Sequence, residues 1–164
     1  MLIFYLIFFV VAMLIHELGH LLAARVCNIP ASELGLGWGR QLYEMRLGAV
    51  RYKLHALPIG AYVRLDMDAL QRRPLDQQVF VLLAGIIVNL IAASVTAGTV
   101  FGAMNLLLAT TNLLPLYQQD GWKCGIVILR ALLRSKSMLV EWTFTIAGGC
   151  LSLSLFAVAA LRYF

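Results

Sequence analysis

Charged residues are scarce in this sequence. Asp, Glu, Lys and Arg make up only 13% of its 164 residues, whereas hydrophobic residues make up 62% and the mean hydropathy is +0.86. A water-soluble domain carries about 25% charged residues, so this chain has too few charges to cover a soluble fold. Because a membrane-crossing helix needs about 20 mostly apolar residues, the length allows three or four spans. We expect a single membrane domain over residues 1–164 and no separate soluble module.

Cysteine is also rare, and positive charge is missing from the N-terminus. Cys27, Cys124 and Cys150 are widely spaced and form no CxxC pair, which argues against a disulfide framework and against a thiolate zinc site. We expect all three to be free. The first apolar run has no basic residue before it and no small-residue cleavage site after it, so we interpret it as a retained span and not as a secretory signal.

The basic residues flank the apolar blocks. Those between the first and second blocks are Arg25, Arg40, Arg46, Arg51, Lys53, Arg64, Arg72 and Arg73, and a later polar stretch carries Lys123, Arg130, Arg134 and Lys136. Loops rich in Lys and Arg stay on the cytoplasmic side. This predicts a cell-membrane protein with an outer N-terminus, residues 25–77 and 118–138 inside, and an outer C-terminus. Since no single basic face with interleaved aromatics is present, we do not expect nucleic-acid binding.

The order of apolar and polar segments predicts a polytopic α-helical membrane protein with about four transmembrane helices. The expected spans are residues 2–24, 78–96, 99–114 and 139–161, and Pro115 separates the third from a further helix at 120–133. Residues 32–66 are different, because clustered glycines and short alternating runs are typical of β-strands. We predict that this insertion forms a small membrane-associated sheet or hairpin, of two to four strands, at the cytoplasmic face.

The most informative motif is H-E-L-G-H, from His16 to His20, within the first span. Residues four apart share one face of a helix, so both imidazoles can bind one zinc ion while Glu17 activates a zinc-bound water. The alternative is a set of helix residues that bind no metal. Because charged side chains at the centre of a bilayer cost about 2.5–3.5 kcal/mol on insertion scales, an apolar helix needs a reason to carry two histidines and a glutamate.

A catalytic zinc site commonly has three protein ligands, and Asp120 is the candidate for the third. It follows the helix break at Pro115, and Gly121 beside it permits unusual backbone geometry. The alternative is that Asp120 only caps a helix at the interface. The remaining histidine, His55, lies in the β region, where a surface or pairing role fits better.

Several motifs together resemble the site-2 protease family of intramembrane zinc metalloproteases. Besides HELGH, the chain has N-x-x-P-x-x-x-x-D-G at residues 112–121 and G-x-x-x-N at 85–89. P-I-G-A-Y-V at 58–63 resembles the membrane-embedded hairpin of the family, with Ala61 in place of a second glycine, and G-L-G-W-G at 35–39 resembles its glycine-rich strand. The resemblance covers about residues 12–125. Gln119 departs from the Leu or Met that often precedes the aspartate.

The resemblance implies roles for further residues. One zinc ion per chain would be held by His16, His20 and Asp120, with Glu17 as general base. Asn112 and Asn89 would face the substrate, although each could instead join helices by hydrogen bonds. The hairpin would hold an unwound substrate as an added strand or would be purely structural; its residues in this role are Pro58, Gly60, Ala61 and Tyr62. No PDZ or C-terminal sensing domain is visible, so a minimal or trimmed member is expected.

The function expected from these features is intramembrane proteolysis of transmembrane protein substrates in a lipid bilayer. A non-catalytic zinc-binding scaffold or sensor is the alternative, but a scaffold would not need Glu17 beside the ligands. A metal transporter would need ionisable residues spread through several spans, and residues 78–96 have none. The sequence leaves open a regulatory membrane protein or a homo-oligomer as a further partner.

Overall fold

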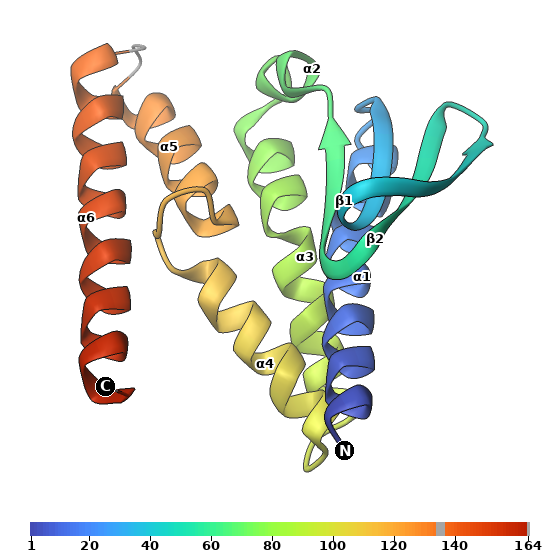
Figure 1. The fold of residues 1–164 in the computed structure, drawn as a ribbon. Helices are drawn as coiled ribbons and strands as arrows, with labels where there is room; N and C mark the ends of the chain where they lie inside the picture. The colour runs from blue at the N-terminus through green and yellow to red at the C-terminus, as the bar shows by residue number, and fades with distance from the viewer. Residues whose placement is uncertain (134–136, 164) are drawn as a thin grey trace.

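The computed structural model describes residues 1–133 and 137–163 of the chain. Six helices and two strands follow one another in these residues (Figure 1). They are α1 (Leu2–Val26), β1 (Ala31–Leu47), β2 (Val50–Leu65), α2 (Met67–Gln71), α3 (Leu75–Val95), α4 (Val100–Leu113), α5 (Asp120–Leu133) and α6 (Met138–Tyr163). The predicted cytoplasmic positions of Arg134 and Lys136 lie outside the described residues.

Three of the helices are long and apolar enough to cross a membrane. These segments are Ile3–Val26, Leu75–Val95 and Met138–Leu155, and the shorter apolar helix Val100–Leu113 accompanies them. The chain is therefore a multi-pass membrane protein, and the predicted fold class is confirmed. Helix α6 stands beside α5 and apart from α1 and α3 (Figure 1), and little of its apolar segment is buried inside the protein.

The helix boundaries follow local chemistry closely. Helix α3 begins at Leu75, directly after Pro74, and so starts before the predicted residue 78. Proline suits a helix start because it has no N–H to leave unpaired. The helix therefore begins directly after this proline and includes the polar residues 76–78, which do not resemble a membrane span. Helix α4 begins after Thr99, whose Oγ1 accepts a hydrogen bond from the Gly102 N–H at 3.0 Å. Helix α5 has the predicted limits.

The predicted sheet is a single antiparallel hairpin, formed by β1 and β2, that projects sideways from α1 (Figure 1). Its turn contains Gly48, with φ +62°, and several register shifts interrupt the pairing. In its outer half, the pairs Tyr43–Leu54 and Met45–Tyr52 alternate with the pairs Glu44–Lys53 and Arg46–Arg51. Since side chains alternate across a strand, one face of this half is apolar and the other is charged.

Helices α1 and α3 pack at very short range because small residues separate them. A Cβ added to Gly19 would lie 2.8 Å from the Ala84 carbonyl oxygen. Small residues commonly allow such close approach between membrane helices. The adjoining buried cluster joins these helices to α2 and α5 through Ala23, Ala24, Cys27, Ile29, Leu70, Val81, Leu82, Ala84 and Cys124. All three cysteines are free, as predicted, and Cys150 is exposed.

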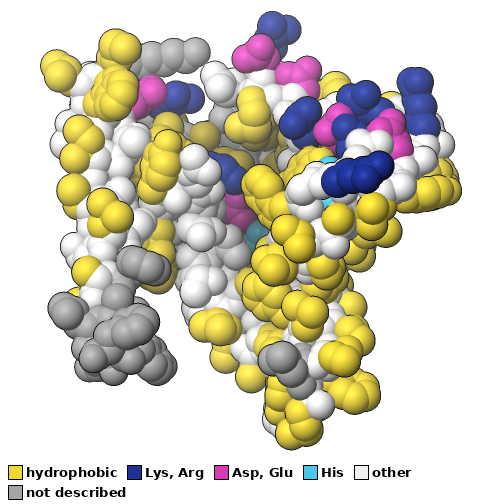
Figure 2. Space-filling model, in the orientation of Figure 1, with side chains coloured by type: hydrophobic (Ala, Val, Ile, Leu, Met, Phe, Trp, Pro, Cys, Tyr) yellow, Lys and Arg dark blue, Asp and Glu magenta, His cyan; other side chains and the backbone are white. Residues whose placement is uncertain are grey.

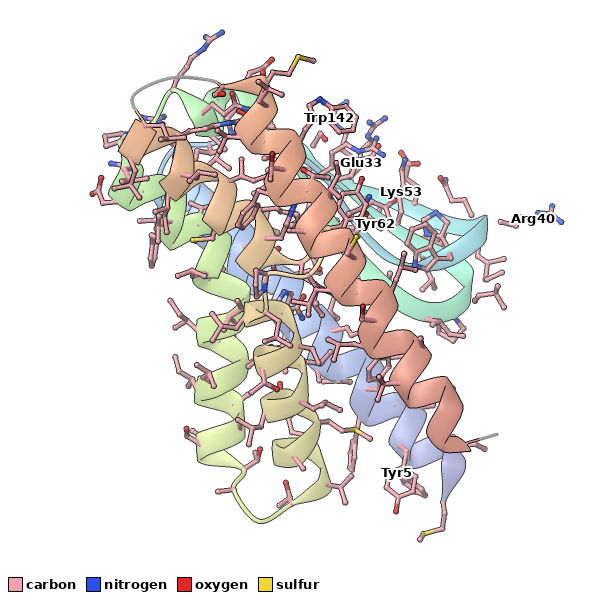
Figure 3. The ribbon with its side chains drawn as sticks, turned by 90° about the vertical axis from the view of Figure 1, so that its left-hand side faces the viewer. Tyr5, Glu33, Arg40, Lys53, Tyr62 and Trp142 are labelled. Atoms are coloured by element: carbon pink, nitrogen blue, oxygen red, sulfur yellow. The ribbon has the colours of Figure 1, made fainter. Side chains whose placement is uncertain are left out.

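A buried carboxylate joins the start of β1 to both ends of β2. Glu33 is only 2% exposed, and its oxygens lie 2.7 Å from Arg51 Nη2, 2.9 Å from Lys53 Nζ and 3.4 Å from Arg64 Nη1. Figure 3 shows Glu33 and Lys53 on the same part of the hairpin. The hydrogen bond from Lys53 and the three positive charges hold the pKa of Glu33 below its usual value, although burial opposes them.

This lowered pKa predicts that the hairpin is acid-sensitive. A carboxyl whose pKa is lower in the folded state stabilises that state above its unfolded pKa, about 4.3, and loses the effect as the pH falls further. The parent hairpin should therefore lose protection from amide exchange below about pH 4.3. Glu33→Gln should lose protection in both strands already at neutral pH, because its three cations lose their counter-charge.

Hydrogen exchange measured by mass spectrometry on residues 31–65 tests this expectation. Glu44→Gln is the matched control, because Glu44 is exposed and lies outside the Glu33 cluster; its Oε2 accepts a hydrogen bond from Gln41 Nε2 at 3.0 Å. Equal exchange in the Glu33→Gln variant and the parent would show that the cluster does not stabilise the hairpin.

Candidate metal centre

Helix α1 carries two histidines toward α3 in the middle of the bundle. His16 and His20 are one helical turn apart, so their side chains lie on one face. Their exposed fractions are 5% and 6%. Asp120, the first residue of α5, reaches the same place and is 6% exposed. Three groups able to bind a metal therefore meet inside the protein.

The three side chains converge on one point. Asp120 Oδ2 lies 2.9 Å from His16 Nε2 and 3.1 Å from His20 Nε2, and the two Nε2 atoms are 3.2 Å apart. A tetrahedral zinc ion with bonds of about 2.0–2.1 Å holds its ligand atoms roughly 3.3 Å apart. The observed triangle is thus close to one face of a zinc tetrahedron.

The hydrogen bond of His20 shows why a cation suits this triangle. Its Nδ1 lies 2.8 Å from the Val81 carbonyl oxygen, which can only accept, so Nδ1 carries the proton and donates it. In the neutral ring, Nε2 then directs a lone pair at the Asp120 carboxylate. Two electron-rich atoms at that distance repel each other unless a proton or a metal ion lies between them. Such second hydrogen bonds commonly orient metal-binding histidines.

Gly85 of α3 leaves the space that the two rings occupy. A Cβ at this position would lie 2.5 Å from His20 Nε2 and 2.8 Å from His16 Nε2. Any side chain here would therefore displace the ligand atoms. The donor set, the triangle and the space beside Gly85 all fit a zinc ion held by His16, His20 and Asp120.

The segment before α5 is shaped to deliver Asp120. After α4 ends at Leu113, the chain turns sharply, and Gln118 adopts φ +70°, a conformation that is uncommon for residues with a side chain. A Cβ on Gly121 would collide with the Leu113 carbonyl oxygen. Glycine therefore lets the start of α5 pack against the end of α4 and brings the carboxylate to the histidines.

A cavity of about 370 Å³ opens beside His16 and Asp120. Glu17 lines it, together with His16, Asp120 and Lys123. Figure 2 shows a hollow in the middle of this face with acidic, basic and histidine side chains inside it. The site thus combines three donor atoms at the spacing of zinc ligands, the separate carboxylate of Glu17, and a cavity with room for a substrate.

The two predicted asparagines lie in different surroundings. Asn112 lines the cavity, and its Nδ2 donates to the Leu108 carbonyl oxygen at 2.9 Å. Asn89 is fully buried, is not among the residues that line this cavity, and has no hydrogen-bond partner for either amide atom among the described residues. Asn89 does not contact this cavity, and its substrate-facing role stays a prediction.

The predicted hairpin residues divide in the same way. Ala61 lines the cavity, whereas Tyr62 lines a neighbouring pocket that it shares with His55. Pro58 is exposed, and Gly60 is buried with φ +99°. A Cβ on Gly60 would strike the indole nitrogen of Trp38, so Gly60 makes room for that ring.

Two cavity residues, Trp38 and Lys123, are not predicted from the sequence to lie at this site. Trp38 is 64% exposed and lines the cavity from β1. In the sequence it is an isolated tryptophan between two glycines. This pattern indicates an unusual backbone conformation but does not predict that the side chain lies at the cavity. Lys123 donates a hydrogen bond from Nζ to Asp120 Oδ1 at 3.0 Å. Its spacing of three from Asp120, on one helix face, could have indicated this contact.

Several bacterial proteins with the provisional name of zinc metalloprotease are similar to this chain. One from Fusobacterium nucleatum is 32% identical over 87 residues, which cover 48% of this chain and 26% of the relative. One from Clostridium acetobutylicum is 34% identical over 95 residues, covering 53% and 28%. One from Chlamydia trachomatis is 44% identical over 52 residues, covering 32% and 8%. The chain thus spans less than a third of the length of these relatives.

The sequence profile described as Peptidase family M50 matches residues 4–102, more than half of the 164-residue chain. The matched segment contains His16, Glu17, His20, the hairpin and Gly85. This agrees with the resemblance inferred from the motifs, and the chain belongs to Peptidase family M50, the site-2 protease family of zinc metalloproteases.

Proposed function

We propose that this chain carries the active site of an intramembrane zinc endopeptidase, which hydrolyses peptide bonds within or near the transmembrane helices of membrane-protein substrates. The observation that supports the proposal most directly is the meeting of His16, His20 and Asp120, whose ligand atoms lie within 4.8 Å of one another, at a cavity lined by Glu17. Membership of a metallopeptidase family supports the same reaction class.

His16, His20 and Asp120 would hold a single zinc ion. When bound, zinc supplies a Lewis acid that polarises a carbonyl and makes water nucleophilic at neutral pH. The chain's contribution is to fix the three donors in advance. Val81 orients the His20 ring through its carbonyl oxygen, and Gly85 leaves the space in which both Nε2 atoms lie.

Glu17 would move the proton. It directly follows His16 in α1, lies at the cavity, and is not part of the three-atom triangle. Its carboxylate would take a proton from the attacking water and would deliver that proton to the nitrogen of the leaving group, which is general acid–base catalysis.

The substrate would enter in an unwound form. A helical substrate keeps its carbonyl oxygens in intrahelical hydrogen bonds, so it must open before its backbone can be attacked. Asn112 donates one N–H to the Leu108 carbonyl oxygen, and the rest of its amide would bind the opened backbone. Ala61 and Trp38 bring the hairpin to the cavity mouth, where a strand edge can pair with an extended segment.

We infer that the site faces the cytoplasmic side, with the N-terminus outside. Figure 2 shows the Lys and Arg side chains gathered at the end of the molecule that carries the hairpin and α2, and hydrophobic side chains covering the opposite end. Basic loops flanking membrane spans stay in the cytoplasm. His16 and His20 lie in the half of α1 that ends near this basic region.

Replacement of Glu17 should stop catalysis without removing the metal. General acid–base groups contribute about 10²–10⁴-fold to rate, so Glu17→Gln should lower cleavage of a transmembrane reporter by that factor. Zinc content should stay at the parent value, because Glu17 is not a ligand. Cleavage is followed by gel mobility of the reporter in proteoliposomes, and zinc by mass spectrometry of the metal.

Glu44→Gln is the matched control and should cleave at the parent rate, because Glu44 lies on the exposed outer part of the hairpin. Parent-level cleavage by Glu17→Gln would contradict the proteolytic assignment. A parent protein that binds zinc but cleaves no reporter would favour the zinc-binding scaffold.

Gly85→Ala should weaken zinc binding, because its new methyl group would push against both Nε2 atoms. Disturbing the surroundings of a metal ligand commonly costs about 10- to 100-fold in affinity, and we expect a loss of at least about tenfold here. Competition with a chromogenic chelator measures the affinity, and circular dichroism shows whether the helices persist.

Gly149→Ala provides the control, because a Cβ on Gly149 would meet no atom within 4 Å. His16→Ala, which creates no clash, should lose zinc as well and covers the case in which Gly85→Ala fails to fold. Unchanged zinc affinity in both ligand-region variants would show that the metal, if present, binds elsewhere.

A further inference from the structure

The two oxygens of the Asp120 carboxylate have different partners. Oδ2 faces His16 and His20 at 2.9 and 3.1 Å, whereas Oδ1 accepts a hydrogen bond from Lys123 Nζ at 3.0 Å. One oxygen is thus directed at the position of the metal, and the other is directed away from it by a cation. The two oxygens of one carboxylate therefore make different interactions.

The start of α5 fixes this arrangement. Asp120 and Lys123 are three residues apart and therefore share one face of the helix. The Lys123 N–H is bonded to the Gln119 carbonyl oxygen at 3.1 Å, which fixes the backbone of that first turn. The Asp120 side chain is 8% exposed and the Lys123 side chain is 42% exposed, so the lysine reaches the buried carboxylate from the cavity side.

The number of oxygens that Asp120 offers decides whether a reactant can bind. Carboxylates can bind a cation through one oxygen or through both. A catalytic zinc site has three protein ligands and one position for water or substrate. If Asp120 used both oxygens, the second would compete for that position.

We infer that Lys123 is a positioning residue that holds Asp120 as a one-oxygen ligand and thereby keeps one coordination position open. The inference rests on the proposed zinc site. Lys123 acts through Asp120 and belongs to neither the ligand set nor the proton path. A simple helix ion pair would stabilise α5 slightly and would leave the metal's coordination unchanged, so coordination is the property to measure.

The experiment compares the parent protein with Lys123→Met, which keeps the length and apolar stem of the side chain but removes its donor and charge. Each purified protein is loaded with Zn²⁺ for X-ray absorption and with Co²⁺ for visible spectroscopy, because four-coordinate cobalt absorbs several times more strongly than five-coordinate cobalt. We expect one metal ion per chain in both proteins. In Lys123→Met, the metal should gain an additional oxygen neighbour and the cobalt bands should be weaker. Cleavage by Lys123→Met should fall by about 10- to 100-fold, as for other groups that orient metal ligands.

Lys123→Arg should restore the parent spectrum and most of the cleavage, since a guanidinium can also donate to Oδ1. Arg72→Met is the charge control, because it removes one exposed positive charge from the end of α2; it should behave as the parent.

A parent-like metal spectrum in Lys123→Met would overturn the inference, whether or not cleavage falls. Loss of the metal from this variant would overturn it too, because a freed carboxylate still offers both oxygens. Failure of the proposed function gives a different result, since the parent itself would then bind no zinc or cleave no reporter.

Discussion

The structure depends on the convergence of two imidazoles and one carboxylate inside an apolar helical protein. Ionisable groups at this depth are costly unless they compensate one another, and the direction of the His20 hydrogen bond leaves its Nε2 facing an anion. A shared cation removes this repulsion and satisfies all three groups. Other features of the fold contribute by bringing α1, α3 and α5 close enough for three atoms to lie about one zinc-ligand spacing apart.

Glycine is the means by which this approach is achieved. Gly19 allows α3 to pack closely against α1, and Gly85 leaves room for the two histidine rings. Gly121 allows α5 to begin against the end of α4. Each glycine removes a different obstacle: a helix backbone, a side chain inside the site, and a preceding carbonyl. A change at one of them would therefore disturb His16, His20 or Asp120 through a different element.

The sequence predicted those parts of the protein in which chemistry and local periodicity coincide. Helical spacing is sufficient to pair His16 with His20, and the helix break at Pro115 indicates Asp120. The sequence did not predict the depth of Asn89, because burial depends on which face of α3 meets its neighbours. It also did not predict the contact of Trp38 with the cavity, which depends on the irregular pairing of the hairpin and on positive φ angles at Gly37 and Gly39. For Lys123 the sequence indicates only a basic residue near a membrane boundary, because its hydrogen bond to Asp120 depends on how α5 begins.

The distance along the chain between the converging groups has a thermodynamic consequence. His16 and Asp120 are 104 positions apart, so a metal ion bound to both closes a long loop in the manner of a covalent cross-link. Cross-links that close long loops restrict the unfolded chain most strongly in the chain-entropy description, and metal binding adds to folding stability when the unfolded chain lacks the site. The ion would thus link α1 to α5 and stabilise the fold. Its removal by a chelator would lower the stability of the folded protein as well as remove a reactive centre.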